Sequence, residues 1–409
     1  MRIGIFTDTY LPDVNGVVTV VRLMERELRR RGHEVYVFAP AYPSATAAAS
    51  EADSEPDSDP GRDGQGPARV LRFPSVRFPY YEGMRVAIPY SREALRLIPT
   101  LEVIHSHDPF SLGLLALWAS RRYEIPHVHT YHTFYAEYRR YLPRPIRPSR
   151  RAVERLSRAF CDRCDAIIAP SLQMKRELER YGITRPIWPL PFGLDEGEFS
   201  RPIRWDARRA LGFPPRERLL LYVGRLGWEK RVDFLLRAFR LILRQRGDVR
   251  LVIAGEGPYR AALERYADEL GLRGKAVFTG YLPRERLIDL YKQADLFVFA
   301  STTETQGLVL QEAMLAGTPP VAVGALGVLD VVRSGETGLL IGEDEGEGGF
   351  ARACLRLLED ERERERLSAA ARRWARLQTA QASVERLLEI YGEVRRTLGS
   401  RGANSGEIG

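Results

Sequence analysis

The alternation of short apolar segments with amphipathic helical patterns, and its restart halfway along the chain, constrains the fold most. An apolar run at 2–8 (RIGIFTD), a helical pattern ending near Gly32 and a second apolar run at 35–40 (VYVFAP) form a strand–helix–strand unit. Such units place their strands side by side in a parallel sheet. The pattern begins again with RLLLYVGRL at 218–226 and VRLVIAGEG at 249–257. The sequence therefore predicts an α/β protein with two doubly wound parallel-sheet domains.

The domain boundaries follow from length and composition. The 409 residues suffice for two domains. We expect the first over 1–195 and the second over 200–378, with a Pro-rich linker at 186–204. A helix at about 380–400 is expected to rejoin the first domain. Residues 41–68 contain almost no large apolar side chains and many Ala, Ser, Asp, Pro and Gly residues, which predicts a disordered insertion.

Composition narrows the choice of partner and compartment. The formal net charge is +8, and a basic surface attracts phosphate in nucleic acid, anionic lipid or nucleotide alike. No nucleic-acid-binding module is recognisable, so nucleic acid is not an expected partner. Neither a signal peptide nor a long apolar run is visible, which predicts a cytoplasmic protein. Three cysteines are too few for a disulfide framework, and Cys161 and Cys164 are interpreted as packing residues.

The first motif with chemical meaning is a pair of glutamates in TETQGLVLQEAM. Glu304 and Glu312 are eight positions apart, and Gly307 between them predicts Glu304 in a loop and Glu312 inside a helix that begins near Leu308. Free backbone N–H groups at such a helix start attract anions. Two carboxylates beside them suit a hydroxyl-rich ligand. The alternative is one solvated glutamate and one capping glutamate.

Cations and a glycine follow other predicted strands. Arg225 and Lys230 flank a glycine-containing loop in VGRLGWEKR, which suits close approach of a diphosphate, although both could be ordinary surface cations. Gly16 follows the first strand and either lets a phosphate approach the next helix or forms a plain turn. G-x-G-x-x-G is absent there, which excludes a nicotinamide-type fingerprint.

Histidines cluster in one part of the chain. Five of the six lie within residues 105–132: His105, His107, His127, His129 and His132. Alternate residues on a strand share a face, so a metal site is one interpretation. Hydrogen bonds to ligand or backbone are the favoured one. No D-x-D triplet follows a predicted strand, and the one at 57–59 lies in the predicted insertion, so no metal is expected to bridge a diphosphate.

Taken together, the segments GRLGWEKR, GEGPYR, FTGYLP and the E-x7-E motif with its trailing AMLAGTP resemble family 4 of the GT-B glycosyltransferases. The likeness spans nearly the whole chain apart from 41–68 and the tail. It implies two Rossmann-like domains facing each other across a cleft. It also implies sugar transfer from a nucleotide-sugar donor with retention of configuration, without a metal or another cofactor.

The resemblance implies a role for each motif residue. Glu312 would bind the donor ribose and Glu304 the donor sugar, while Arg225 and Lys230 would bind the diphosphate. His132 would lie beside the reacting sugar. Further donor contacts fall on backbone positions: Gly16, Gly280, Tyr281, Gly307 and Leu308. With no metal, cations and helix-start amides must stabilise the leaving diphosphate. Family chemistry favours a same-face substitution in which the departing phosphate helps to deprotonate the acceptor.

A narrower likeness concerns the acceptor. HTYHTFYAEYRRYL, ETQG and RVAIPYS are similar to bacterial diacylglycerol glucosyltransferases. This implies transfer of glucose from UDP-glucose to diacylglycerol at the inner face of the cell membrane. PFGLD at 191–195 departs from relatives that carry a small polar residue before the glycine. The alternatives are a GDP-mannose-dependent mannosyltransferase acting on phosphatidylinositol or another acceptor, a soluble acceptor, and a nucleotide-sugar 2-epimerase. The oligomeric state stays open.

Residues 139–158 carry eight arginines and one acidic residue, which suits an anionic membrane surface as partner. Each cation near such a surface contributes about 1 kcal/mol. The apolar residues Ala152, Val153, Leu156, Ala159 and Phe160 are expected to share one helical face. Aromatic residues of PYYEGM, at 79–84, could add interfacial contacts. The predicted membrane or acceptor contacts are Arg147, Arg150, Arg151, Arg155, Arg158, Tyr131 and Tyr135. The alternative is a solvated, arginine-rich helix.

Overall fold

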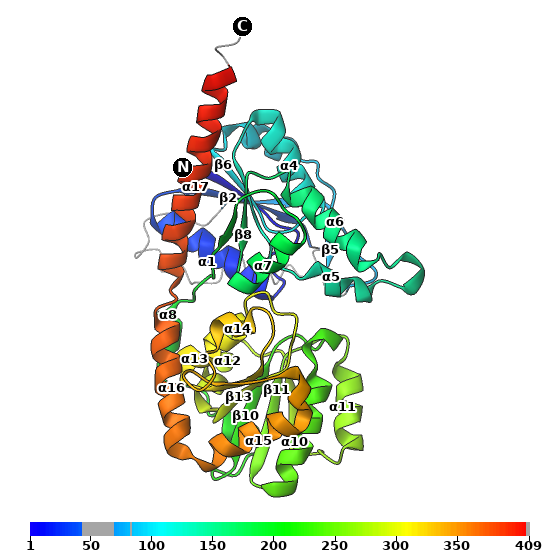
Figure 1. The fold of residues 1–409 in the computed structure, drawn as a ribbon, viewed down its shortest axis with the longest axis vertical. Helices are drawn as coiled ribbons and strands as arrows, with labels where there is room; N and C mark the ends of the chain where they lie inside the picture. Colours follow the sequence, from blue (N-terminus) through cyan, green and yellow to red (C-terminus); the bar gives the residue numbers. More distant parts are fainter. Residues whose placement is uncertain (43–68, 82–83, 406–409) are drawn as a thin grey trace. The chain divides into compact units, whose positions relative to one another are not determined.

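The structure, a computed structural model, describes residues 1–42, 69–81 and 84–405 (Figure 1). Most of the predicted insertion at 41–68 lies outside these described residues. The chain forms two compact units, Met1–Phe192 with Ala380–Gly409, and Gly193–Thr379. These divisions fall close to the positions near 195 and 380 that the sequence suggests. Within the described residues, no helix is long and apolar enough to span a bilayer.

The first unit is built on a seven-stranded parallel sheet in the order β3-β2-β1-β6-β7-β8-β9. Its strands are β1 (Arg2–Phe6), β2 (Glu34–Pro40), β3 (Arg69–Phe73), β6 (Val103–Ser106), β7 (His127–Thr130), β8 (Ala166–Ala169) and β9 (Ile187–Pro189). A separate antiparallel pair joins β4 (Ser75–Arg77) to β5 (Arg85–Ala87). The helices are α1 (Gly16–Arg30), α3 (Arg92–Leu97), α4 (Ser111–Tyr123), α5 (Tyr135–Tyr138), α6 (Arg150–Cys161), α7 (Leu172–Arg180) and α17 (Ala380–Ser405).

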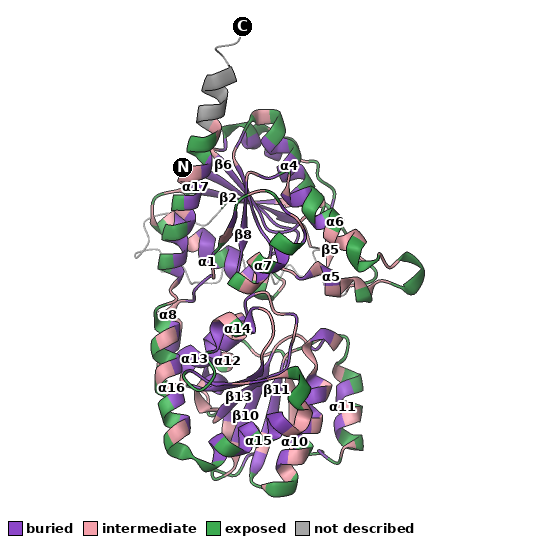
Figure 2. Ribbon diagram, in the orientation of Figure 1, coloured by how far each residue is buried: buried purple, intermediate pink, exposed green. Residues whose placement is uncertain are grey.

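Apolar packing holds this sheet, and Figure 2 shows its central strands almost entirely buried. The rings of Phe6 and Phe38 stack with centroids 4.1 Å apart on the neighbouring strands β1 and β2. Helix α1 begins where the side chain of Asn15 accepts hydrogen bonds from the backbone of Val17 and Val18. This N-cap satisfies donors that have no partner inside the helix. The first strand–helix–strand unit therefore forms as the sequence predicts.

The Pro-rich stretch at 186–204 is only partly the linker that the sequence predicts. Ile187–Pro189 forms β9, which pairs with β8 and ends the sheet on that side. An edge strand tolerates proline because one of its sides needs no hydrogen-bond donors. The helix α8 (Glu196–Ser200) follows, with Asp195 as its N-cap. The prediction of a linker from the proline content was therefore wrong for this edge strand.

The second unit has a six-stranded parallel sheet in the order β12-β11-β10-β13-β14-β15. The strands are β10 (Arg218–Val223), β11 (Val249–Ala254), β12 (Ala276–Gly280), β13 (Leu296–Phe299), β14 (Pro320–Val323) and β15 (Leu339–Ile341). Besides α8, its helices are α9 (Ala207–Ala210), α10 (Val232–Gln245), α11 (Arg260–Glu269), α12 (Arg284–Gln293), α13 (Leu308–Ala316), α14 (Val328–Val331), α15 (Gly346–Glu359) and α16 (Glu361–Arg376).

The last helix, α17, belongs to the first unit although the chain enters it from the second. Tyr391 on α17 is fully buried there, and its hydroxyl lies 2.6 Å from Nδ1 of His105 on β6. Arg395 also forms a 2.9 Å ion pair with Glu102. The chain thus returns to complete the unit with which it began.

Candidate donor and acceptor sites

The acidic motif has the local structure that the sequence predicts. Gly307 is the N-cap of α13 with φ 89°, so Glu304 lies in the preceding loop and Glu312 inside the helix. Such a left-handed backbone strongly favours glycine. The loop is held by Gly327, whose backbone N–H donates to the carbonyl of Glu304 at 2.9 Å. The first backbone N–H groups of α13, from Leu308 onward, therefore begin beside Glu304.

Two of the predicted donor-site residues meet directly. Nζ of Lys230, at the end of a 3-10 turn after β10, lies 2.6 Å from Oε1 of Glu304. Both side chains are mostly buried, with 14% and 16% of their surface exposed. Arg225 lies half-buried in the same loop, and its carbonyl accepts a hydrogen bond from Tyr222 at 3.2 Å. The structure thus brings a cation and a carboxylate together from segments 74 residues apart.

Glu312 is held by partners that the sequence interpretation missed. The hydroxyl of Tyr291 donates to Oε2 of Glu312 at 2.8 Å, and the Arg284 guanidinium pairs with Oε1. Arg284 also pairs with Glu198 at 2.9 Å. Burial lowers the pKa of Arg284, but the two carboxylates raise it more, so its charge is secure. Arg284 directly follows the family segment FTGYLP, and its positive charge was the sequence signal that could have indicated a carboxylate partner.

The strand ends around this motif lie in close backbone contact. A β-carbon on Gly255, after β11, would stand 2.0 Å from the carbonyl oxygen of Gly224, after β10, so this crossing requires glycine. The backbone N–H of Gly255 donates to the carbonyl of Gly280 at 2.9 Å. Tyr281 follows with 58% of its surface exposed. The loops after β10, β11 and β12 are therefore fixed relative to one another.

In the first unit, most of the clustered histidines bond to protein groups. His105 contacts Tyr391, and the hydroxyl of Ser106 lies 2.8 Å from ring nitrogens of both His127 and His129. All three imidazoles are fully buried, and burial lowers the pKa of each. Neutral imidazoles in such contacts agree with the hydrogen-bonding interpretation favoured from the sequence.

His107 and His132 form a further pair at the ends of β6 and β7. Nδ1 of His107 lies 2.7 Å from Nε2 of His132. His107 is fully buried and His132 half-buried, and burial lowers the pKa of both. The Phe192 ring centre lies 6.1 Å from that of His132. The histidine assigned to the reacting sugar is therefore neutral and keeps part of its ring accessible.

Two buried aspartates nearby escaped the sequence interpretation. Asp8 follows β1, where its Oδ1 accepts hydrogen bonds from the Ser111 hydroxyl at 2.6 Å and from the backbone of Leu112 at 3.1 Å. Asp108 follows β6, and its Oδ2 accepts from the backbone N–H of Asp8 at 3.1 Å. Burial and the neighbouring Asp108 raise the pKa of Asp8 to about 7. Their positions at strand ends were the only sequence signal.

Gly16 is the first residue of α1 and is exposed directly after the Asn15 cap. Its backbone N–H is one of those that an α-helix leaves without an internal partner. The approach of a phosphate to this helix start stays a prediction.

The predicted apolar face of α6 is wrong in part. Phe160 is buried in the core with 7% of its surface exposed, whereas Leu156 is 68% exposed and Ala159 is exposed as well. The buried side instead includes Ser157, because the hydroxyl of Tyr131 lies 2.8 Å from its Oγ. Leu156 and Ala159 are therefore exposed, as a membrane-facing side requires, whereas Phe160 is not available to a membrane.

Of the two tyrosines assigned to the membrane or the acceptor, Tyr131 needs correction. Tyr131 has 1% of its surface exposed and is fixed by Ser157, so it is a packing residue that cannot reach a membrane surface. Tyr135 is half-buried, and its hydroxyl lies 3.4 Å from Oδ1 of Asp108. It therefore faces the aspartate pair.

The predicted membrane arginines differ in their partners. Arg150 pairs with Glu154 and Glu177, and Arg158 pairs with Asp162. Arg147 donates to the backbone carbonyls of residues 140 and 142. Exposed Arg151 and Arg155 have no ion pair within the part of the chain that the structure describes.

The cysteines are buried with free thiols: Cys161, Cys164 and Cys354. Burial raises the pKa of each thiol, which makes them unreactive packing residues, as interpreted for the C-x-x-C pair.

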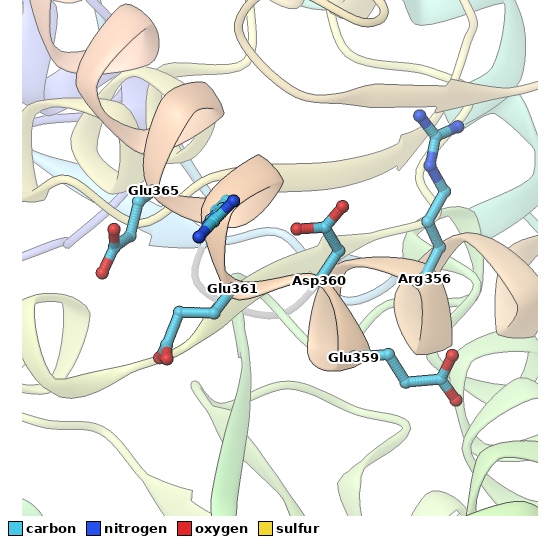
Figure 3. Close-up of a pocket in the computed structure, with 6 residues that line it drawn as sticks. Arg356, Glu359, Asp360, Glu361 and Glu365 are labelled. Atoms are coloured by element: carbon cyan, nitrogen blue, oxygen red, sulfur yellow. The ribbon is translucent and has the colours of Figure 1, made fainter.

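A pocket of about 700 Å³ lies at the junction of α15 and α16, and Figure 3 shows the side chains that line it. Only charged side chains line it: Arg356, Glu359, Asp360, Glu361, Arg362 and Glu365. Asp360 is the N-cap of α16, and Arg356 pairs with Glu363 at 2.6 Å. This helix junction contains none of the predicted donor or acceptor residues.

Comparisons with known proteins agree with both halves of the chain. Residues 203–374 match the family described as "Glycosyl transferases group 1", and residues 14–198 match "Glycosyltransferase Family 4". The chain is 34% identical over 333 residues to an alpha-monoglucosyldiacylglycerol synthase of Streptococcus pneumoniae, covering 79% of this chain and 71% of the relative. It is 32% identical over 398 residues to a GDP-mannose-dependent alpha-mannosyltransferase of Mycobacterium tuberculosis, covering 97% of each.

Solved structures share the fold. Anabaena HepE in complex with UDP-glucose superposes with a TM-score of 0.74 at 18% identity, covering 98% of this chain and all of the other. Sucrose-phosphate synthase from Thermosynechococcus elongatus gives a TM-score of 0.73 at 21% identity, covering 97% of this chain and all of the other. At these identities the likeness concerns architecture alone.

Proposed function

This chain belongs to the family 4 glycosyltransferases of GT-B fold, and we propose that it transfers glucose from UDP-glucose to diacylglycerol with retention of configuration. We place the reaction at the inner face of the cell membrane, without a metal. The glucosyldiacylglycerol synthase relative supports the donor sugar and the acceptor. The exposed apolar and arginine side chains of one segment carry the lipid part of the proposal.

That segment is residues 139–158, which we call the arginine segment. Within it, Ile146 and Leu156 expose 54% and 68% of their surface, and the cations Arg151 and Arg155 are exposed as well. Large apolar side chains between arginines are costly in water and favourable at an anionic bilayer, where the chains enter the interface and the cations meet lipid phosphates. The combination favours a lipid surface over a soluble acceptor.

An aromatic cluster adjoins the arginine segment. The ring of Tyr81 lies 4.9 Å from that of Tyr141 and 5.9 Å from that of Tyr138, between centroids. Tyr80 is 44% exposed next to it. Tyrosines are favoured at membrane interfaces because an apolar ring and a polar hydroxyl suit the two sides of the boundary. This supports the interfacial role expected for residues 79–84, of which 82 and 83 lie outside the described residues.

On the donor side, the Lys230–Glu304 ion pair supports binding of a charged, hydroxyl-bearing ligand. A diphosphate would take Lys230 as a partner, and the donor sugar's hydroxyls would take Glu304. Arg225 and the N-terminal amides of α13 would share the charge that develops on the leaving diphosphate. The same residues would thus bind the donor and stabilise its departure.

Ribose recognition would fall to Glu312. Its carboxylate is oriented by Tyr291 and Arg284, so hydroxyl donors of a ribose would meet a fixed acceptor. His132, neutral because of its lowered pKa, would contribute a hydrogen bond beside the reacting sugar and no charge. The departing phosphate would then receive the proton of the acceptor hydroxyl.

The second candidate is a GDP-mannose-dependent mannosyltransferase. The mannosyltransferase relative aligns over 97% of both chains, which exceeds the coverage of the glucosyldiacylglycerol synthase relative. The donor-site residues described above would serve either nucleotide, because they contact diphosphate, ribose and sugar hydroxyls. The base and the acceptor distinguish the two candidates.

A donor-by-acceptor screen tests the proposal. The purified chain is incubated with UDP-glucose or GDP-mannose and with liposomes that contain diacylglycerol, phosphatidylinositol or neither. Released nucleotide and extracted glycolipid are both measured. Glucolipid formed only from UDP-glucose with diacylglycerol is the expected result. Mannolipid from GDP-mannose supports the second candidate, and sugar transfer to a soluble acceptor alone overturns the lipid assignment.

Liposome co-sedimentation tests the surface separately. Two cations contribute about 2 kcal/mol at an anionic bilayer, so Arg151→Gln with Arg155→Gln is expected to weaken binding about 30-fold. The matched control is Arg240→Gln with Arg244→Gln, which removes two exposed cations from α10 of the second unit. Equal losses in the two double variants would indicate attraction by net charge and refute a defined surface.

A further inference from the structure

The helix α4 is apolar on its outer side, which is unusual for a helix at a protein surface. Its inner side, with Leu112, Leu115 and Ala116, packs into the core of the first unit. A surface helix normally carries polar or charged residues on the opposite side. The helix α10 of the second unit, which has a similar length, follows this rule and exposes Arg240 and Arg244.

Three large apolar side chains occupy the outer side of α4. Leu114 and Trp118 expose 56% and 45% of their surface, and Phe110 at the N-cap exposes 38%. The backbone N–H of Leu114 donates to the carbonyl of Phe110 at 2.7 Å, so the helical geometry already includes Phe110. Residues four positions apart share one side of a helix. These three residues therefore form one exposed stripe, which we call the α4 face.

Cations lie at the C-terminal end of the α4 face. Arg121 and Arg122 follow Trp118 in the last turns of the helix and are exposed. Neither forms an ion pair within residues 1–42, 69–81 and 84–405. The Arg122 guanidinium lies 5.4 Å from the ring centre of Tyr123, and the Trp118 ring lies 5.9 Å from the same ring. Exposed apolar side chains followed by cations suit a partner that is both apolar and anionic.

The α4 face adjoins the helix of the arginine segment. A β-carbon on Gly113 of α4 would stand 3.4 Å from the Phe160 ring of α6, so the two helices touch. The strands β6, β7 and β8 are neighbours in the sheet, and connections of this kind are right-handed, which puts α4 and α6 on the same side of it. On α6, Leu156 and Ala159 are exposed. Both helices therefore expose apolar side chains on one side of the first unit.

We propose that the α4 face is a membrane-docking surface that inserts Phe110, Leu114 and Trp118 into the interface of an anionic bilayer. Removal of these side chains from water is favourable, and tryptophan is favoured at the boundary between headgroups and acyl chains. Arg121 and Arg122 then meet lipid phosphates beside them. A second copy of this chain is a poorer occupant, because it carries the same net charge of +8. The choice of a bilayer rests on the proposed function, which puts the acceptor in a membrane.

The fluorescence of Trp118 tests the insertion. The chain has five tryptophans, and Trp118 is the exposed one among the residues that the structure describes. The purified chain is mixed with vesicles of equal amounts of phosphatidylcholine and phosphatidylglycerol, with or without bromine atoms on the acyl chains. We expect brominated lipid to quench the emission, and the quenching to disappear in Trp118→Phe. No quenching, or quenching that persists in Trp118→Phe, overturns the proposal.

A double variant adds a binding measurement. Leu114→Gln with Trp118→Gln removes two apolar side chains from the α4 face, and co-sedimentation with the anionic vesicles is expected to weaken about 30-fold. The matched control is Leu329→Gln with Leu377→Gln, which removes two exposed leucines of the second unit and is expected to bind as the wild type does. Equal losses in the two double variants, or no loss in the first, contradict a docking role of the α4 face.

Two further measurements separate this proposal from its alternatives. Light scattering without vesicles is expected to give the same molecular mass for the wild type and the α4 double variant. A lower mass for the variant would identify a second copy as the occupant and refute the membrane role. If Trp118 is quenched but no glucolipid forms from UDP-glucose and diacylglycerol, the proposed function fails and the docking surface stands. If glucolipid forms without quenching of Trp118, the docking surface fails and the proposed function stands.

Discussion

In the second unit, Lys230 and Glu304 face each other as an ion pair at 2.6 Å, whereas in the first unit His107 and His132 share a hydrogen bond between neutral rings at 2.7 Å. The two units thus hold their polar groups at strand ends by different means. Charged partners suit a ligand that arrives with charge, such as a diphosphate, because each can exchange its partner for the ligand. Neutral rings suit hydroxyl groups, which they can bind without a change of charge.

Breaking the ion pair should give the largest effect. Lys230→Ala and Glu304→Ala are each expected to reduce kcat/KM more than about 100-fold, since each removes a contact to charge or hydroxyls of the donor. Steady-state kinetics measure the loss, and thermal unfolding shows whether the variant stays folded. Glu343→Ala is the control, because it breaks a 3.3 Å surface pair with Arg231. Near-normal turnover in either donor-site variant refutes its role.

In the first unit, the buried Asp8 should make the free energy of unfolding depend on pH. Burial raises the pKa of Asp8 to about 7 from 3.8, so the folded chain keeps a proton that the unfolded chain has lost. The protonated Asp8 carboxyl therefore contributes its full stabilisation of the fold below about pH 4. This contribution is lost as the pH rises from about 4 through about 7. The buried histidines, whose pKa is lowered, act in the opposite direction, losing stability as pH falls below about 6.5.

The difference between wild type and Asp8→Asn isolates the aspartate. Between pH 5 and 7 the free energy of unfolding of the wild type should fall relative to the variant by about 2 kcal/mol. Urea denaturation at several pH values measures it. A difference that does not change with pH would show that Asp8 ionises normally in the folded chain.

A variant of Arg284 tests whether donor binding in the second unit depends on the orientation of Glu312. Arg284→Gln removes the ion pair to Glu312 but leaves the Tyr291 hydrogen bond in place. We expect the donor KM to rise about tenfold, with a smaller change in kcat, because orientation of the ribose contact is lost. Because Glu312 is only 7% exposed and loses its cation, thermal unfolding is measured beside the kinetics. A lower kcat at unchanged KM would contradict ribose binding by Glu312.

The smallest effect is expected for Tyr131→Phe. The variant loses the hydrogen bond to Ser157, which costs about 1 kcal/mol of unfolding free energy. Liposome binding should stay unchanged, because Tyr131 is buried. Weaker co-sedimentation at unchanged stability would restore Tyr131 to the membrane contacts that the sequence suggested.

Local features were predictable from the sequence, and distant pairings were not. Glu304, Gly307 and Glu312 lie within nine residues, so spacing alone placed the loop and the helix. The strand Ile187–Pro189 was missed because it has only three residues and lies in a Pro-rich stretch, which is typical of a linker. The family resemblance assigned roles to motif residues, but their partners come from other segments.

The missed partners show the same limit. Asp8 meets Asp108 across 100 residues, and Arg284 reaches Glu312 from another helix. The spacing of residues within one helix or strand does not indicate such long-range contacts. Phe160 on α6 was assigned to a membrane-facing side for a related reason, since it is buried against His129, a residue of the strand β7. Pairing across the fold, and not propensity, determines these positions.

The return of α17 to the first unit has a consequence for biosynthesis. Synthesis runs from the N-terminus, so Tyr391, which contacts His105, emerges from the ribosome only after the whole of the second unit. The second unit, Gly193–Thr379, is continuous and complete before α17 appears. We therefore expect the second unit, although its synthesis starts later, to finish folding earlier, while the first unit waits for α17.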